Sequence, residues 1–177
     1  MTSVESGIAR RYLASQKALY AADAVAERAM ADLAGVADPN ALLVGGTLST
    51  FTDGPSSGTR TLVDGSTIDL AVVVDMANCG KPTACSDAEM NVVTAERPWG
   101  ADNPRWQLFA FGPLKDVAPE ADVRSTAYVV AMLAADPFQE GAVALRAEAF
   151  GALAVHRIVE LGVSCPGPRV VSWRQVQ

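Results

Sequence analysis

One short stretch of the sequence has the spacing of a catalytic motif. Residues 54–58 read Gly-Pro-Ser-Ser-Gly, a Gly-x-Ser-x-Gly pattern that in some hydrolases exposes a nucleophilic serine on a strand-to-helix turn. Such a serine needs a histidine as its base, and the chain has a single one, His156. The residues after 58 predict strands and a hairpin instead, and Pro55 restricts the backbone beside Ser56. We interpret the stretch as a loop and expect no catalytic residue, with a Ser56–His156 hydrolase as the alternative.

The cysteines could bind a metal or form a disulfide. Cys79 and Cys85 stand close together in CGKPTAC, whereas Cys165 lies far along the chain. With His156 they could form a zinc site, but paired zinc ligands usually have about two to four residues between them, and this pair has more. A close pair in a Gly/Pro loop suits a disulfide and so an oxidising compartment. We predict a Cys79–Cys85 disulfide, and we expect neither a metal site nor a cofactor.

Charged side chains alternate with apolar ones near the carboxyl end. Arg146 and Glu148 stand between apolar residues, and Arg157 and Glu160 follow on the next predicted strand. The pattern predicts a hairpin whose solvent-facing side carries cross-strand charge pairs. His156 is interpreted as a solvent-facing or hydrogen-bonded strand residue rather than a ligand.

Trp99 and Trp106 flank a loop rich in Gly, Asp, Asn and Pro. Such a pair could form a platform on which sugars stack, which would make the chain an extracellular, adhesin-like binding module. A loop of this length also needs apolar anchors, and we favour the interpretation that both tryptophans cover an edge of the sheet.

The composition argues against nucleic-acid binding. The chain has 177 residues and a formal net charge of −6, and its 14 basic residues are scattered rather than clustered. Phosphate backbones recruit clustered Lys and Arg, so we expect no nucleic-acid partner. No apolar run reaches the roughly 18 residues that a membrane-spanning helix needs.

A long amphipathic helix is predicted at the amino end. Apolar residues recur at helical spacings between residues 2 and 33, and Gly35 and Pro39 then signal its end. This stripe consists of Ile8, Tyr12, Leu19, Ala22, Ala26, Met30 and Leu33. We expect the helix to cover at least residues 8–33, with Ile8 and Tyr12 more exposed than Met30 and Leu33.

Further small residues lie outside the stripe, at Ala18, Ala21, Ala24 and Ala31. A helix that is buried on one face only normally carries charged residues on the other. Because these positions are not polar, we predict that they face away from the sheet and, if the chain is a subunit of an assembly, that they contact its neighbours.

The rest of the chain predicts mainly β-structure. Short β-branched runs separated by Gly, Asp and Ser predict strands at 42–51, 59–63, 66–76, 105–111, 126–135, 142–150, 153–163 and 169–176, with a tight turn at 63–66 and an irregular section at 78–105. One long helix followed by such strands indicates an α+β fold, in which the helix packs on a mainly antiparallel sheet.

Several segments resemble the PilX-type minor pilin family. Residues 18–33, ALYAADAVAERAMADL, are similar to the helix signature of that family. Residues 96–114 and 144–163 are similar to its sheet portion, and residues 169–176, RVVSWRQV, resemble its terminal strand. Residues 40–90 carry no such likeness.

The resemblance implies a pilin-like fold and a non-catalytic role. Residues 1–36 would continue an apolar membrane helix that is not present in this sequence, and residues 37–177 would form a β-sheet domain, all within one globular unit. The implied partners are other pilin or pseudopilin subunits and, through that anchor, the inner membrane. The implied location is the periplasmic face of the inner membrane or a cell-surface pilus.

Overall fold

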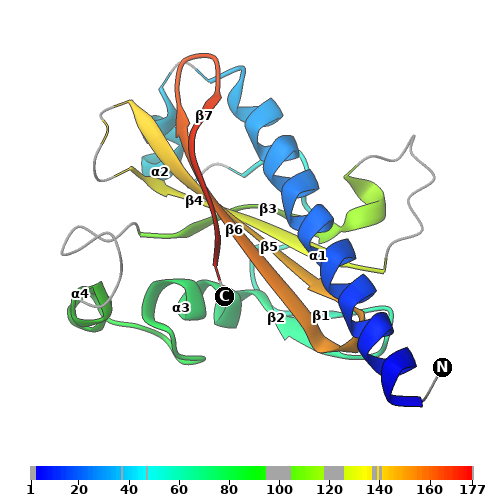
Figure 1. The fold of residues 1–177 in the computed structure, drawn as a ribbon. Helices are drawn as coiled ribbons and strands as arrows, with labels where there is room; N and C mark the ends of the chain where they lie inside the picture. The colour runs from blue at the N-terminus through cyan, green and yellow to red at the C-terminus, as the bar shows by residue number, and fades with distance from the viewer. Residues whose placement is uncertain are drawn as a thin grey trace.

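The fold is a long helix packed on an antiparallel sheet, as the sequence predicts. The computed structural model describes residues 3–36, 38–46, 48–94, 105–117, 126–136, 139 and 141–176. Helix α1 (Ser3–Leu33) crosses one face of the sheet diagonally, and its amino end extends past the strands (Figure 1). One apolar core lies between α1 and the sheet, and a second lies on the opposite face beneath helix α3 (Leu70–Cys79). The fold is therefore α+β.

The sheet is an antiparallel meander. Its strands follow chain order as β3 (Gln107–Pro113), β4 (Tyr128–Ala135), β5 (Ala142–Gly151), β6 (Val155–Ser164) and β7 (Arg169–Val176). Two 3₁₀ turns, Leu114–Asp116 and Ala152–Ala154, follow β3 and β5. The last three strands coincide closely with the predicted runs, because alternating apolar residues of strand period mark them clearly.

The outer edge of β3 is covered by residues 49–52, which lie between α1 and the hairpin at residues 59–69 in the chain. The backbone N–H of Ser49 donates to the carbonyl of Phe109 (2.7 Å), and that of Phe111 donates to Phe51 (3.0 Å). Thr52 also forms a parallel bridge with Phe111. This edge strand thus has hydrogen-bond partners on both sides.

The carboxyl-terminal half of α1 packs on the sheet through small side chains. The buried residues of the helix are Ala18, Ala21, Ala22, Val25, Ala26, Ala29 and Leu33. The same core contains Ala131, Ala147 and Ala149 of β4 and β5, so alanine meets alanine across the interface. Small side chains on both surfaces let the helix lie close to the sheet. Ile8 and Tyr12 are exposed, whereas Leu33 is buried and Met30 partly so, which confirms the predicted gradient.

The prediction that the off-stripe alanines face away from the sheet is wrong for Ala18 and Ala21. Both are 1% exposed, within the core between α1 and the sheet. Ala24 is partly buried and packs against the same core, and Ala31 is exposed. The reason is that a helix lying this close to a sheet buries a face wider than one stripe.

Two predicted strands are wrong in part. Residues 66–76 contribute only β2 (Thr67–Asp69) before α3 begins, and the first four residues of 42–51 lie in α2 (Pro39–Gly45). Asp69 caps α3, because its Oδ1 accepts from the N–H of Ala71 (2.8 Å) and of Val72 (3.4 Å). Gly80, with φ of 68°, ends the helix in the left-handed conformation.

The predicted hairpin and disulfide are confirmed. Strand β1 (Thr59–Thr61) pairs with β2 in antiparallel fashion, and the Asp64 carboxylate accepts from the Ser66 N–H (3.0 Å) in the turn. Cys79 and Cys85 are bonded, with their Cα atoms 6.1 Å apart, and Cys165 is a free thiol. The predicted irregular section, 78–105, contains helix α4 (Asp87–Thr94), and its residues 95–104 lie outside the described ranges.

A matched pair of alanine variants tests the wide buried face of α1. Ala21→Leu adds bulk to a close-packed interface and should lower the free energy of unfolding by about 1–3 kcal/mol. Ala31→Leu, on the exposed side, should change it by about 0.5 kcal/mol or less. Urea unfolding measures both values. Equal stabilities of the two variants would contradict this packing.

Candidate functional site

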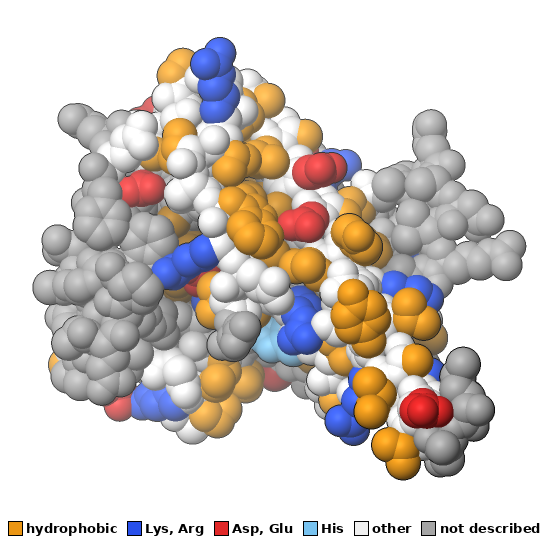
Figure 2. Space-filling model, viewed as in Figure 1, with side chains coloured by type: hydrophobic (Ala, Val, Ile, Leu, Met, Phe, Trp, Pro, Cys, Tyr) orange, Lys and Arg blue, Asp and Glu red, His pale blue; other side chains and the backbone are white. Residues whose placement is uncertain are grey.

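The amino-terminal half of α1 does not pack on its own domain. The helix has 31 residues, which corresponds to about 46 Å, whereas a strand of ten residues spans only about 33 Å. Residues 4–17 are all exposed or partly exposed, and the first buried side chain is Ala18. The half that projects carries an exposed apolar row nonetheless, because Val4, Ile8 and Tyr12 recur one turn apart and all are exposed. Figure 2 shows hydrophobic side chains gathered at this end of the helix.

Arg157 of β6 marks the point where the helix leaves the sheet. Its Nε and Nη2 both donate to the Ser15 hydroxyl, at 2.9 and 2.6 Å. The guanidinium also donates from Nη1 to the carbonyl of His156 (3.1 Å), which holds the arginine against its own strand. The helix is thus tied down immediately before the buried half starts.

A groove of about 320 Å³ runs between the projecting half and the turn that joins β5 to β6. Leu13 and Lys17 line one side, and Gly151 and Leu153 line the other. Leu153 has a φ of 61°, and Ala154 has a φ of 55°. Residues with a Cβ adopt this left-handed conformation at a cost of roughly 1–2 kcal/mol. The turn accepts this strain while exposing the apolar side chain of Leu153 to solvent.

The apolar residues that α1 exposes are mostly not the alanines that were predicted to contact other subunits. Of these, Ala31 is exposed and Ala24 partly so, whereas Ala18 and Ala21 lie inside the domain. The exposed large apolar residues of the helix are instead Val4, Ile8, Tyr12 and Leu13 in its amino-terminal half, and Tyr20 in the other half. Their spacing is visible in the sequence, but Ile8 and Tyr12 fall on the same helical stripe as residues that face the sheet.

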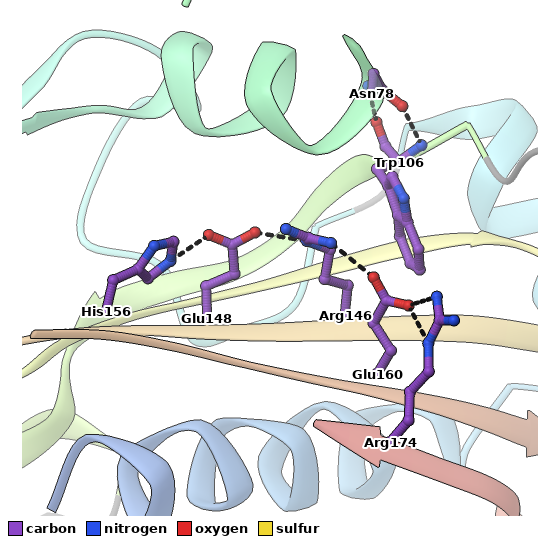
Figure 3. A network of polar contacts seen from close by, with 7 residues as sticks. All are labelled: Asn78, Trp106, Arg146, Glu148, His156, Glu160 and Arg174. Carbon is purple, nitrogen blue, oxygen red and sulfur yellow. Dashed lines mark hydrogen bonds and ion pairs between the residues drawn. The ribbon is translucent and has the colours of Figure 1, made fainter. Parts of the chain in front are cut away.

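A row of charged side chains crosses the opposite face of the sheet (Figure 3). Arg146 of β5 donates from Nε to Glu148 (2.6 Å) and from Nη1 to Glu160 of β6 (2.6 Å). Glu160 also accepts from Nε of Arg174 on β7 (2.8 Å), and Glu148 lies 2.7 Å from Nε2 of His156. Opposite charges therefore alternate across neighbouring strands.

The row is buried, which corrects the prediction of a solvent-facing charged hairpin. Glu148 is 2% exposed, and Arg146 and Glu160 are also buried. The cross-strand pairing of Arg146 with Glu160 is as predicted, and α3 lies on the same side of the sheet (Figure 3). The alternation identifies the strands, but it does not show that this face is buried.

The electrostatics of the row favour the charged forms of Glu148 and Arg146. Burial alone would raise the pKa of Glu148, but the hydrogen bond from His156 and the charge of Arg146 outweigh it, so that the pKa lies below its ordinary value. Burial likewise opposes the charge on Arg146, and the two carboxylates more than compensate, which raises its pKa. The network is thus a set of ion pairs.

Helix α3 is held over β3 by Asn78 and Trp106. The Asn78 amide donates from Nδ2 to the Trp106 carbonyl (3.0 Å), and its Oδ1 accepts from the Trp106 N–H (2.8 Å). The indole is buried in the core beneath α3. Trp106 therefore cannot serve as one half of a sugar platform, and Trp99 lies outside the described residues.

The residues of the alternative hydrolase and metal sites have other partners. Ser56 lies in an exposed loop that Arg60 holds through the carbonyls of Pro55 (2.6 Å) and Ser57 (3.3 Å). His156 is bonded to Glu148, and no described contact joins it to that loop. Within the described ranges, no group of three or more His, Cys, Asp or Glu side chains is placed to hold a metal ion.

Comparisons with known proteins give no relative. No family model matches the chain, and neither the curated proteins nor the solved structures include a match. Among the helices that the structure describes, none has both the length and the apolar character to cross a membrane.

The charged row leads to a stability test. Arg146→Met keeps most of the side-chain volume but leaves two buried carboxylates without their shared partner, so the free energy of unfolding should fall by about 3–5 kcal/mol. Arg174→Met removes an ion pair from the more exposed end of the row and should cost about 1 kcal/mol or less. Urea unfolding at neutral pH compares the two. Similar losses in both variants would show that burial does not govern the row.

Proposed function

We propose that the chain is a non-catalytic assembly subunit that joins pilin-like partners through the amino-terminal half of α1. The observation that carries the proposal is the division of that helix, since residues 18–33 supply all of its buried side chains and residues 4–17 supply none. The resemblance of residues 18–33 to the PilX-type helix signature points to the same class, a minor pilin or pseudopilin of a type IV pilus or a related secretion filament.

The projecting half has a physical reason to seek a partner. A helical segment of about 14 residues that buries none of its side chains gains little stability from packing. Its exposed apolar row, Val4, Ile8 and Tyr12, gains stability when another surface covers it. The strained, exposed turn at Leu153 adds a second apolar element beside the helix. Both features are costly for an isolated domain and are useful in an interface.

The disulfide supports a location outside the cytoplasm. A bond such as Cys79–Cys85 persists in oxidising compartments, which include the periplasm and the cell surface. An assembly subunit at the periplasmic face of the inner membrane or within a surface filament would occupy such a compartment.

Charged substitutions on the projecting half separate assembly from folding. Ile8→Glu and Tyr12→Glu alter side chains that are 66% and 63% exposed, so the isolated domain should keep its melting temperature. Each should weaken co-purification with pilin-like subunits of the same organism by about tenfold or more, because a carboxylate would be buried in the contact.

Val63→Glu is the matched control, since Val63 is an exposed apolar residue in the hairpin turn, far along the chain from α1. It should assemble as the unsubstituted chain does. Assembly at control levels by both helix variants would refute the proposed surface.

The turn between β5 and β6 provides an independent test. Leu153→Gly relieves a left-handed conformation that is unfavourable for leucine, so the domain should be as stable as before or slightly more stable. The same change removes an exposed apolar side chain from the groove, and co-purification should weaken by a few-fold. A variant that is as stable and assembles fully would exclude the turn from the interface.

A further inference from the structure

A second groove lies on the face of the sheet opposite α1. It occupies about 440 Å³, within the range of small-molecule sites, between α3, the β1–β2 hairpin and the strands β5 and β6. Its apolar wall includes Ile68, Val72, Val73 and Met76. Met76 is 45% exposed, although it is a large apolar side chain on a helix that is otherwise packed against the sheet.

The position of α3 explains why the groove exists. The second core beneath the helix is built from β3 and β4, with Phe111, Val130 and Met132 as its large buried members. The charged row occupies β5, β6 and β7 on the same face. The groove follows the border between the apolar half of this face and the charged half, where a helix flank meets side chains with which it cannot pack.

The polar end of the groove is formed by Glu148 and His156. The imidazole stacks on Phe150, with ring centroids 4.4 Å apart and planes inclined by 13°, and its side chain is 41% exposed. The Glu148 carboxylate is buried in the groove wall. An ionised carboxylate has about four acceptor positions, of which Arg146 fills one on Oε1 and His156 one on Oε2. Capacity for a further donor remains.

The charges of the groove favour a cation. Its described ionisable lining groups are Glu148, Asp69 and His156, and neither Lys nor Arg is among them. Farther along the row, Arg146 is shared between Glu148 and Glu160, and at the other end Arg174 supplies a second positive charge to Glu160. At the groove end, the imidazole of His156 is the group that the described residues place in the corresponding position beside Glu148.

We propose that this groove binds a small organic cation, a primary ammonium group carried on an apolar body. The ammonium lies at the Glu148–His156 end, where it donates charge-assisted hydrogen bonds to the carboxylate. The apolar body lies along Val72 and Met76 of α3. This site is separate from the α1 surface and does not depend on the assembly role.

The single histidine of the chain makes the test direct, because its imidazole proton signals report on one position only. The full chain is titrated with 2-phenylethylammonium, with the neutral 2-phenylethanol and with the anionic 3-phenylpropionate. The ammonium should shift the His156 signals saturably below about 10 mM, the weak end for a ligand of this size. The alcohol should bind about tenfold more weakly or worse, and the anion should not bind.

Variants locate the site. Met76→Arg places a fixed cation on the exposed flank of α3 and should weaken amine binding at least about tenfold by repulsion. Val63→Arg adds the same charge at an exposed turn that does not line the groove, and it should bind as the original chain does. Circular dichroism shows whether the Glu148→Gln variant folds. A folded Glu148→Gln variant should no longer bind the amine more tightly than the alcohol.

Several results would overturn the assignment. Equal affinity for the amine and the alcohol would show that the Glu148 carboxylate does not bind the ammonium group. The absence of a saturable shift below about 10 mM would remove the site. Unchanged amine binding by Met76→Arg would place the ligand elsewhere, even if Glu148→Gln fails to fold.

Discussion

The close approach of α1 to the centre of the sheet is the constraint on which the rest of the structure depends. Ala18, Ala22 and Ala26 pack in the same core as Ala131, Ala147 and Ala149 of the sheet, beside larger residues such as Leu145. At Gly151, where the helix reaches the end of β5, an added Cβ would lie 3.4 Å from that of Ala18. Because the contact is so close, it constrains the position of the helix.

The other face of the sheet satisfies a different constraint. Burying charged groups is unfavourable unless each has a partner, and the row from His156 to Arg174 provides one at every step. Helix α3 covers the apolar half of this face, and Asn78 attaches its carboxyl end to the Trp106 backbone. This face of the sheet therefore has an apolar half and a charged half, and the groove lies along the border between them.

The sequence predicts the parts of the fold that local pattern determines. The carboxyl-terminal strands, the long helix, the turn at Asp64 and the disulfide all follow from spacing and residue type. Helix α3 does not, since LAVVVDM is rich in β-branched residues and has the apolar run of a buried strand. The signals that could have identified it are its caps, Asp69 before the run and Gly80 after it.

The sequence patterns could not show which side chains would be buried by segments far away in the chain. The alternation at Arg146 and Glu148 identifies a strand correctly, but it does not show which face another element will cover. Likewise, the helical pattern of α1 could not show how wide a face would be buried, because that width depends on how closely the sheet lets the helix approach. The groove beside His156 arises from α3, a helix that the sequence did not predict, and it was missed for the same reason.

The two edges of the five-stranded sheet differ, because the edge at β3 is covered by another segment of the chain. Backbone groups that already have partners cannot recruit another strand, and the segment from Ser49 to Thr52 occupies those of β3. Within the described ranges, the only strand paired with β7 is β6. Pairing between two copies at β7 would therefore leave a closed edge at each end of the joined sheet. Misassociation through strand edges would stop at a pair and could not propagate into a ribbon.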